Sequence, residues 1–244
     1  MLAALLDLAL PRRCAGCGRE GAALCPECRH DLAVELRAGA SPARPLPCPA
    51  GLPPSVAATA YAGVTRALVL AHKERGRADL AAPLGLLLAG AVVAVAPPGP
   101  FAVVAVPTTR MARRRRGRDP LRAITRHAVL VLRGLGLDAR QLQLLRVVGR
   151  PRDQAGLAGA DRAANLAGAF AARGNDPGIP IVLVDDVLTT GATLAEAARA
   201  AATTAATVHA AAVIAGTALR PRPDARNLTA TSLVPGPPLR RESS

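Results

Sequence analysis

The chain has 244 residues, enough for one α/β domain of ordinary size with a small appendage. Hydrophobic residues make up 50% of it and aromatic residues only 1%, so its core must be built from Ala, Val and Leu. The net charge of +14 is almost all arginine, since Lys73 is the only lysine. This charge favours phosphorylated or nucleic-acid partners, although a GC-rich genome equally encodes such a composition. No Walker A motif is present, which excludes ATP-driven work by this chain.

Two apolar stretches fit neither a signal peptide nor a membrane span. Residues 1–14 carry no basic n-region and contain Asp7, so we expect a short helix that docks on the domain. Residues 80–96 are uncharged, but they are shorter than a typical span and run directly into Pro97. They predict a buried helix. We therefore expect no membrane span and a cytoplasmic location.

Four of the five cysteines form two CxxC pairs, separated by seven residues: Cys14, Cys17, Cys25 and Cys28. Each pair can present two thiolates to one tetrahedral ion, so the spacing predicts a structural zinc site. Two disulfides are the competing interpretation, which a reducing cytosol disfavours. Residues 1–38 are thus expected to form an N-terminal helix and a four-cysteine module. The Pro-rich residues 39–54 are expected to link this module to the main domain, residues 55–219.

The main domain begins with a helical run that ends near Lys73. A basic turn follows, in which His72, Lys73, Arg75 and Arg77 surround Gly76. These side chains fit an anion site or an exposed turn equally well.

Residues 101–106 predict a buried strand, and a small polar turn from Pro107 to Arg110 follows it. Six arginines lie within residues 110–118. Such a block repels itself unless it meets an anion or stays mobile. A basic loop that closes over a diphosphate is one interpretation, and a groove for single-stranded nucleic acid is another, although no aromatic residues are interleaved for base stacking.

The remaining elements alternate between helices and strands. We expect a helix at 121–135, a strand at 141–148, a loop and helical turn with a short edge strand over 150–170, a helix at 194–206 and a strand at 207–214. The tail, residues 220–244, is Pro- and Arg-rich and is expected to be disordered.

The most informative stretch is IVLVDDVLTTGATL, residues 181–194. A β-branched run predicts a buried strand, two acids follow it, and a hydroxyl-rich turn then leads into an alanine-rich helix. The turn offers backbone N–H groups and hydroxyls to a phosphate, whereas Asp185 and Asp186 suit sugar hydroxyls or a metal cation. Together they describe a sugar-phosphate site. The alternative is a capped helix after a buried strand, with both acids merely solvated.

This stretch resembles the motif with which type I phosphoribosyltransferases bind phosphoribosyl pyrophosphate (PRPP). The resemblance implies that Asp185 and Asp186, the catalytic pair, hold the ribose hydroxyls. It implies that the 5′-phosphate is bound by Thr189, Thr190, Gly191, Ala192 and Thr193. The turn containing Thr108 and Arg110 suits the pyrophosphate. The implied fold is an α/β fold with a phosphoribosyltransferase-like parallel sheet flanked by helices, preceded by a small zinc-ribbon-like module.

Several further motifs resemble the ComF/GntX family over roughly residues 5–217. They are the four-cysteine module, Tyr61-x-Gly63-x-x-Arg66, Val106-Pro107, Arg116-Gly117, Arg152-x-Gln154-x-Gly-Leu157 and Arg162-x-x-Asn165-x-x-Gly168-x-Phe170. That family is associated with natural competence and the handling of incoming single-stranded DNA. One departure is that Arg118-Asp119-Pro120-Leu121 replaces the family's usual Phe-Asn-Gln-Ala.

The resemblance implies a glycosyltransferase reaction. A nitrogen acceptor, whose identity the sequence does not give, displaces pyrophosphate from C1 of PRPP with Mg²⁺ on the diphosphate. The alternative is a non-catalytic accessory protein in DNA uptake, which binds PRPP, phosphate or single-stranded DNA beside a competence motor protein. Turnover with release of pyrophosphate separates the two. The sequence gives no oligomeric state.

Overall fold

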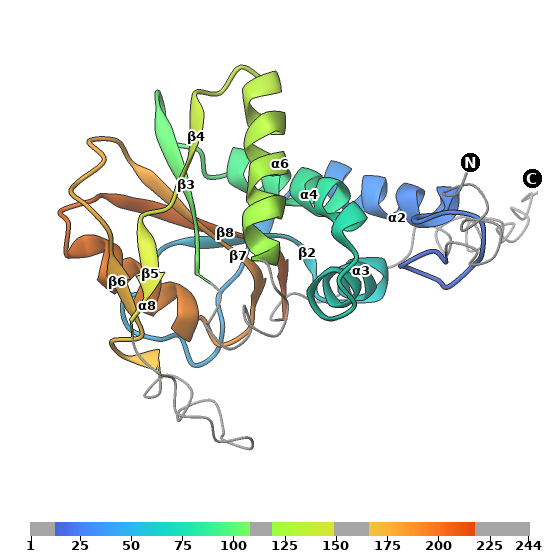
Figure 1. Cartoon of the computed structure of the whole chain (residues 1–244), viewed down its shortest axis with the longest axis horizontal. Coiled ribbons are helices and arrows are strands. Elements are labelled where there is room, and N and C mark those ends of the chain that lie inside the picture. The colour runs from blue at the N-terminus through green and yellow to red at the C-terminus, as the bar shows by residue number, and fades with distance from the viewer. Residues whose placement is uncertain (1–12, 108–118, 149–165, 218–244) are drawn as a thin grey trace, which may run out of the picture.

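The computed structural model describes residues 13–107, 119–148 and 166–217 (Figure 1). Its centre is a six-stranded sheet in the order β1-β2-β8-β7-β3-β4. All neighbours are parallel except β1 and β2. The strands are β1 (Ser41–Pro42), β2 (Ser55–Ala60), β3 (Phe101–Ala105), β4 (Ala139–Leu142), β7 (Ile181–Leu188) and β8 (Val208–Gly216). The expected α/β class with a mostly parallel sheet is confirmed.

Helices cover both faces of the sheet because its central strands are apolar on both sides. On one face, Val103, Val182 and Val184 pack against helices α3 (Gly63–Glu74), α4 (Ala81–Val93) and α6 (Pro120–Gly134). On the other, Val104 and Leu183 pack against helix α8 (Ala192–Ala202). Figure 1 shows this division, with α3, α4 and α6 on the opposite side of the sheet from α8.

The two helices expected near residues 80–96 and 121–135 are confirmed as α4 and α6, which pack closely. A Cβ added at Gly85 of α4 would lie 2.5 Å from the Cβ of His127 in α6, so glycine permits the approach. The 13 residues of α4 follow a short 3-10 helix, η1 (Ala78–Leu80). Among the described helices, none combines the length and apolarity that crossing a membrane requires.

The first turn of α6 contains the Asp119-Pro120 pair that departs from the family pattern. Asp119 is the N-cap, and its carboxylate accepts a hydrogen bond from the Arg122 backbone N–H at 3.4 Å. Pro120 occupies the first helical turn, where its missing N–H costs nothing. The pair therefore begins a helix.

The prediction of a single strand at 141–148 is wrong, because two separate strands cover this segment. The chain leaves the main sheet after Leu142, and β5 (Leu145–Val147) pairs instead with β6 (Phe170–Ala172) in a separate antiparallel pair. Leu145 and Val147 are buried while Arg146 between them is exposed, so the alternation suits a strand with only one face on the core. The short edge strand expected near residue 170 is confirmed as β6.

The four-cysteine module packs on the main domain. Its helix α2 (Pro26–Arg37) contacts α3, α4 and β2, and Leu24 and Leu32 belong to the same apolar cluster as Leu68 and Leu84. Part of the Pro-rich segment 39–54 also joins the sheet, because β1 pairs with β2. The predictions for the N-terminal helix, the basic loop, the loop before Asn165 and the tail fall on residues 1–12, 108–118, 149–165 and 218–244, outside the described residues.

Candidate functional site

Strand β7 and the turn that follows it line a cleft of about 490 Å³ at the carboxyl edge of the sheet. We call this the acidic cleft. Its polar lining comprises Asp185, Asp186, Thr189 and Thr193, together with Tyr61 and with Lys73 and Glu74 of α3. Pro107, the second residue after β3, forms part of another wall. In open parallel sheets this edge is where ligands bind.

Both acids lie within β7, whereas the sequence suggested a strand that ends before them. The reason is that β8 continues to pair with β7 as far as Leu188, opposite Gly216. The Asp186 backbone N–H donates to Oδ1 of Asp185 at 2.8 Å. Burial and the charge of Asp186 raise the pKa of Asp185 to about 7. Asp185 is therefore poised between its protonated and ionised forms near neutral pH.

Lys73 is the site residue whose place the sequence did not reveal. Its Nζ lies 2.8 Å from Oδ2 and 3.1 Å from Oδ1 of Asp186, across 113 positions of the chain. The Asp186 side chain is 15% exposed and that of Lys73 is 37% exposed, so a ligand can reach the ion pair. The sequence signal was that Lys73 is the only lysine in a chain whose other cations are arginines.

The remainder of the basic turn has a structural task. His72 is buried, and its ring nitrogens lie 2.7 Å from the Arg77 carbonyl oxygen and 3.2 Å from the Pro120 carbonyl oxygen. Arg77 donates to Asp79 and to the carbonyls of Arg13 and Ala23, which ties the turn to the four-cysteine module. Lys73 therefore fits the anion-site interpretation of this turn, whereas His72 and Arg77 hold the structure together. Arg75 is exposed, as in the alternative interpretation.

The turn after β7 forms the start of helix α8. Gly191 is the N-cap residue with φ +78°, a left-handed conformation that favours glycine. Thr190 Oγ1 accepts from the Ala192 N–H at 3.5 Å. Thr189 and Thr193 face the cleft, whereas Thr190, Gly191 and Ala192 form the turn outside its lining. The first N–H groups of a helix favour an anion at this end.

The Pro-rich segment 39–54 closes over this turn. A Cβ added at Gly191 would lie 3.1 Å from Leu52 and 3.2 Å from Pro45. Thr108 and Arg110, which the resemblance assigns to the pyrophosphate, lie outside the described residues.

The four cysteines meet in one cluster, here called the four-cysteine cluster. The Sγ atoms of Cys14, Cys17, Cys25 and Cys28 all lie within 4.8 Å of one another, and Cys17 and Cys25 are 3.6 Å apart. Four sulfurs around one zinc are about 3.8 Å apart, since each Zn–S bond is about 2.3 Å long. The four side chains are thus positioned to bind a metal ion, in agreement with the CxxC spacing.

The electrostatics of the cluster also fit a cation. Burial, followed by the neighbouring thiols, raises the pKa of Cys28. Burial also acts against ionisation of Cys14, but backbone N–H donors led by that of Cys25 outweigh it and lower its pKa to about 6. Four thiols this close cannot all ionise together without a positive partner.

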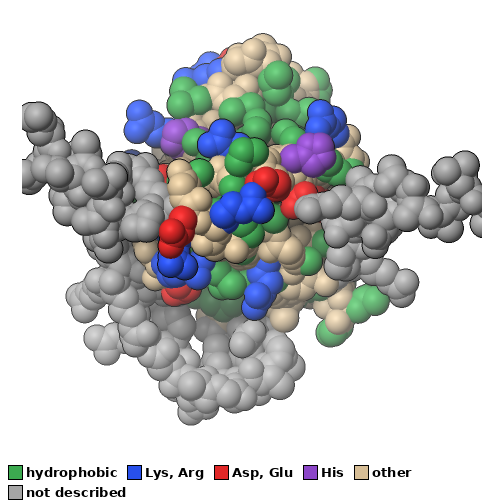
Figure 2. All heavy atoms as spheres, turned by 90° about the vertical axis from the view of Figure 1, so that its right-hand side faces the viewer, with side chains coloured by type: hydrophobic (Ala, Val, Ile, Leu, Met, Phe, Trp, Pro, Cys, Tyr) green, Lys and Arg blue, Asp and Glu red, His purple; other side chains and the backbone are tan. Residues whose placement is uncertain are grey.

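Charge on the outer face near α2 and α3 is mixed. Figure 2 shows basic and acidic side chains side by side in the described part of this face. Ion pairs such as Arg19–Glu27 and Arg13–Glu20 account for part of the mixture. The described part of this face therefore presents no continuous basic patch.

No family model matches the chain, and a search of curated proteins finds no match either.

Proposed function

We propose that the acidic cleft binds Mg²⁺–PRPP and that the protein is a phosphoribosyltransferase-type member of the ComF/GntX family. One observation carries this proposal. The adjacent acids Asp185 and Asp186, two threonines and the only lysine meet in a single cleft beside the start of helix α8, which Glu74 also lines. Acceptors for hydroxyls and donors for a phosphate are thus a few residues apart, as a sugar phosphate requires.

Each part of the cleft has a matching part of the ligand. Asp185 and Asp186 accept hydrogen bonds from the ribose hydroxyls, and their oxygens are also of the type that Mg²⁺ prefers. The N–H groups at the start of α8 and the hydroxyls of Thr189 and Thr193 face the 5′-phosphate. When bound on the diphosphate, Mg²⁺ supplies charge neutralisation for the departing pyrophosphate.

Lys73 serves as an internal counter-ion in this proposal. Without ligand it neutralises Asp186, which keeps two adjacent carboxylates from repelling each other unopposed. When a hydroxyl or cation engages Asp186, the ammonium group is free to turn towards a phosphate oxygen. The exchange keeps the charges of the cleft paired in both states.

The proposed reaction is a displacement at C1 of the ribose. A bond forms between the acceptor nitrogen and C1 while the bond from C1 to the pyrophosphate oxygen breaks, and the electron pair leaves with pyrophosphate. Asp185 and Asp186 hold the ribose and stabilise the positive charge that develops on the ring.

A second function, non-catalytic binding in DNA uptake, is favoured by the six arginines of residues 110–118 and by the net charge of +14.

The test is calorimetric titration with Mg²⁺–PRPP of the native protein and of the Asp185→Asn, Asp186→Asn double variant. Binding by the native protein that weakens at least about 100-fold in the double variant supports the proposal, since two charged hydrogen-bonding groups are lost. The matched control is Asp138→Asn, because Asp138 is an exposed acid paired with Arg140 away from the cleft.

Failure of the native protein to bind PRPP would leave nucleic acid or a protein partner as the leading candidate. If PRPP binds, release of pyrophosphate with a nitrogen acceptor separates an enzyme from a binding protein. A steep fall of single-stranded DNA affinity with salt supports the second function, and Arg113→Ala to Arg116→Ala together should flatten that dependence.

A further inference from the structure

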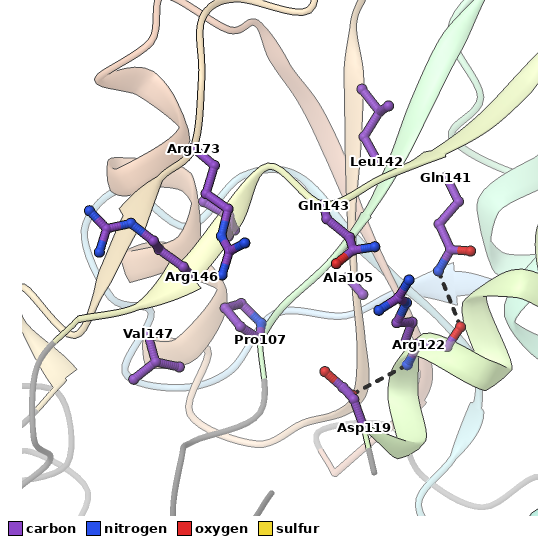
Figure 3. A pocket seen from close by; sticks show the side chains of 11 residues that line it. Ala105, Pro107, Asp119, Arg122, Gln141, Leu142, Gln143, Arg146, Val147 and Arg173 are labelled. Atoms are coloured by element: carbon purple, nitrogen blue, oxygen red, sulfur yellow. Dashed lines mark hydrogen bonds between the residues drawn. The ribbon is translucent and has the colours of Figure 1, made fainter.

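A second, smaller cavity lies at the same edge of the sheet, beyond β3 and β4. Its volume is about 170 Å³, and its lining differs from that of the acidic cleft because three arginines face it. Arg122 comes from α6, Arg146 from β5, and Arg173 directly follows β6. Figure 3 shows Arg146 and Arg173 on one side of the cavity and Arg122 on the other, with Gln143 and Pro107 between them. We call this the basic pocket.

In the part of the chain that the structure describes, the arginines of the basic pocket form no ion pair. Within residues 13–107, 119–148 and 166–217, their guanidinium groups form no salt bridge and no hydrogen bond to another side chain. This contrasts with Arg140, Arg77 and Arg199, each paired with an acid. Asp119 is the one acid among the described lining residues. Among these residues, three positive charges thus face one negative charge around a small space.

The remaining polar groups of the pocket are amides. The Gln141 side chain donates to the Arg122 carbonyl oxygen at 3.1 Å, which holds this amide beside the first turn of α6. Gln143 is exposed at the end of β4. Drug-sized ligands occupy cavities of about 300–1,000 Å³, so this pocket suits a single small group. Guanidinium and amide N–H donors around that space suit an oxyanion.

We propose that the basic pocket binds a phosphate group. A surplus of two positive charges matches a phosphate dianion better than a single carboxylate, and donors from three separate elements match its three terminal oxygens. The site is distinct from the proposed 5′-phosphate position at α8, because none of the three arginines lines the acidic cleft. Pro107 lines both cavities, so a ligand held here by its phosphate lies next to the acidic cleft. The proposal holds whether or not the cleft binds PRPP.

The experiment is calorimetric titration with inorganic phosphate, in which chloride keeps the ionic strength constant as the phosphate concentration changes. The test protein is the Arg146→Gln, Arg173→Gln double variant, since both arginines are exposed and their replacement spares the core. Arg126→Gln is the matched control, because Arg126 is exposed on the same helix as Arg122 but does not line the pocket. Asp185→Asn, Asp186→Asn serves as the control for the acidic cleft.

We expect one phosphate-binding event to weaken at least about tenfold in the arginine double variant and to persist in both controls. Equal binding by the double variant and the native protein would overturn the proposal, as would the absence of phosphate binding in the native protein. Tighter binding of malonate than of phosphate would overturn the phosphate assignment. Titration with ribose 5-phosphate shows whether the occupant is an organic phosphate or the free ion. If ribose 5-phosphate binds at least about tenfold more tightly than phosphate and its binding is lost in the same variant, the occupant is an organic phosphate. Equal affinities indicate the free ion.

Discussion

The four-cysteine cluster and the acidic cleft both bring negative groups together, but they neutralise them differently. In the cluster, four sulfurs lie within 4.8 Å of one another, and no lysine or arginine of the described residues donates a hydrogen bond to them. In the acidic cleft, Lys73 lies 2.8 Å from Asp186. Arg19 and Arg77 act on the cysteines only through their charge and without a hydrogen bond, so the cluster suits a metal ion as its direct partner. The cleft already holds a cation in direct contact with one of its acids.

The difference distinguishes a cluster suited to a structural metal from a cleft suited to reversible binding. Three of the four cysteines are buried and continuous with the apolar cluster of α3 and α4, so an ion bound there supports the fold. The acidic cleft is open, and its lysine is 37% exposed. A ligand that bound there would not have to disturb the core.

The largest expected effect is that of removing the metal. Structural zinc sites contribute about 10–16 kcal/mol in small peptides, so chelation or Cys28→Ser should lower the melting temperature by roughly 10 °C or more. Cys48→Ser is the control, because Cys48 lies outside the cluster. We expect one zinc per chain by metal analysis. Fresh reduced protein that contains no metal and melts unchanged after chelation would contradict a structural metal.

The next effect is a pH dependence that belongs to the acidic cleft. Asp185 has a pKa of about 7 in the folded protein against an ordinary value of 3.8. Between these values the unfolded chain releases a proton that the folded chain keeps, so stability falls as pH rises through this window. Asp185→Asn should remove this pH-dependent loss of stability. Its free energy of unfolding should therefore rise relative to that of the native protein by an amount on the order of a few kcal/mol between about pH 5 and pH 8. Urea unfolding of both proteins at the two pH values measures it, and a pH-independent difference would rule it out.

A smaller effect is expected from removing the internal cation. Lys73→Met leaves Asp186 without its counter-ion and takes away a charge that lowers the pKa of Asp185. We expect a loss of about 1–3 kcal/mol at pH 8, less at pH 5, because the pair is only partly exposed. Arg140→Met is the matched control, since the exposed Arg140–Asp138 pair should contribute only about 0–1 kcal/mol. Equal losses from the two variants would show that Lys73 is no more than a surface charge.

The smallest expected effects compare one glycine from each region. A Cβ at Gly16 would lie 2.7 Å from the Cys28 Sγ, so Gly16→Ala should weaken metal binding about 10–100-fold.

In the acidic cleft region, Gly191→Ala should lower the free energy of unfolding by about 1–2 kcal/mol because Gly191 has a left-handed backbone. The added Cβ would also crowd Leu52 and Pro45. Gly174→Ala measures the backbone cost alone, because Gly174 has φ +74° with nothing within 4 Å. The excess cost of Gly191→Ala over Gly174→Ala is then the crowding. Zinc titration and urea unfolding measure the two effects. Unchanged zinc affinity in Gly16→Ala would show that the contact with Cys28 is not tight. Equal costs in Gly191→Ala and Gly174→Ala would show the same for the contacts with Leu52 and Pro45.

The amino-acid sequence by itself determined what depends on short spacings. Two CxxC pairs place four thiols within fifteen residues, and the structure confirms their cluster. Apolar stretches located α4, α6, β3 and β8 to within a few residues, because the length and polarity of a stretch indicate which kind of element is buried. The same stretch that predicted a buried strand before an anion-binding turn forms β7 and the start of α8.

Only the tertiary structure decided which distant residues meet. Nothing local to Lys73 indicates that it reaches Asp186, and nothing local to Arg122 indicates that it shares a pocket with Arg146 and Arg173. The expected strand at 141–148 divided because pairing depends on a partner elsewhere in the chain, here β3 for one part and β6 for the other. Spacing along a chain specifies local conformation, but charge pairing and strand pairing are decided by distances that only the folded chain sets.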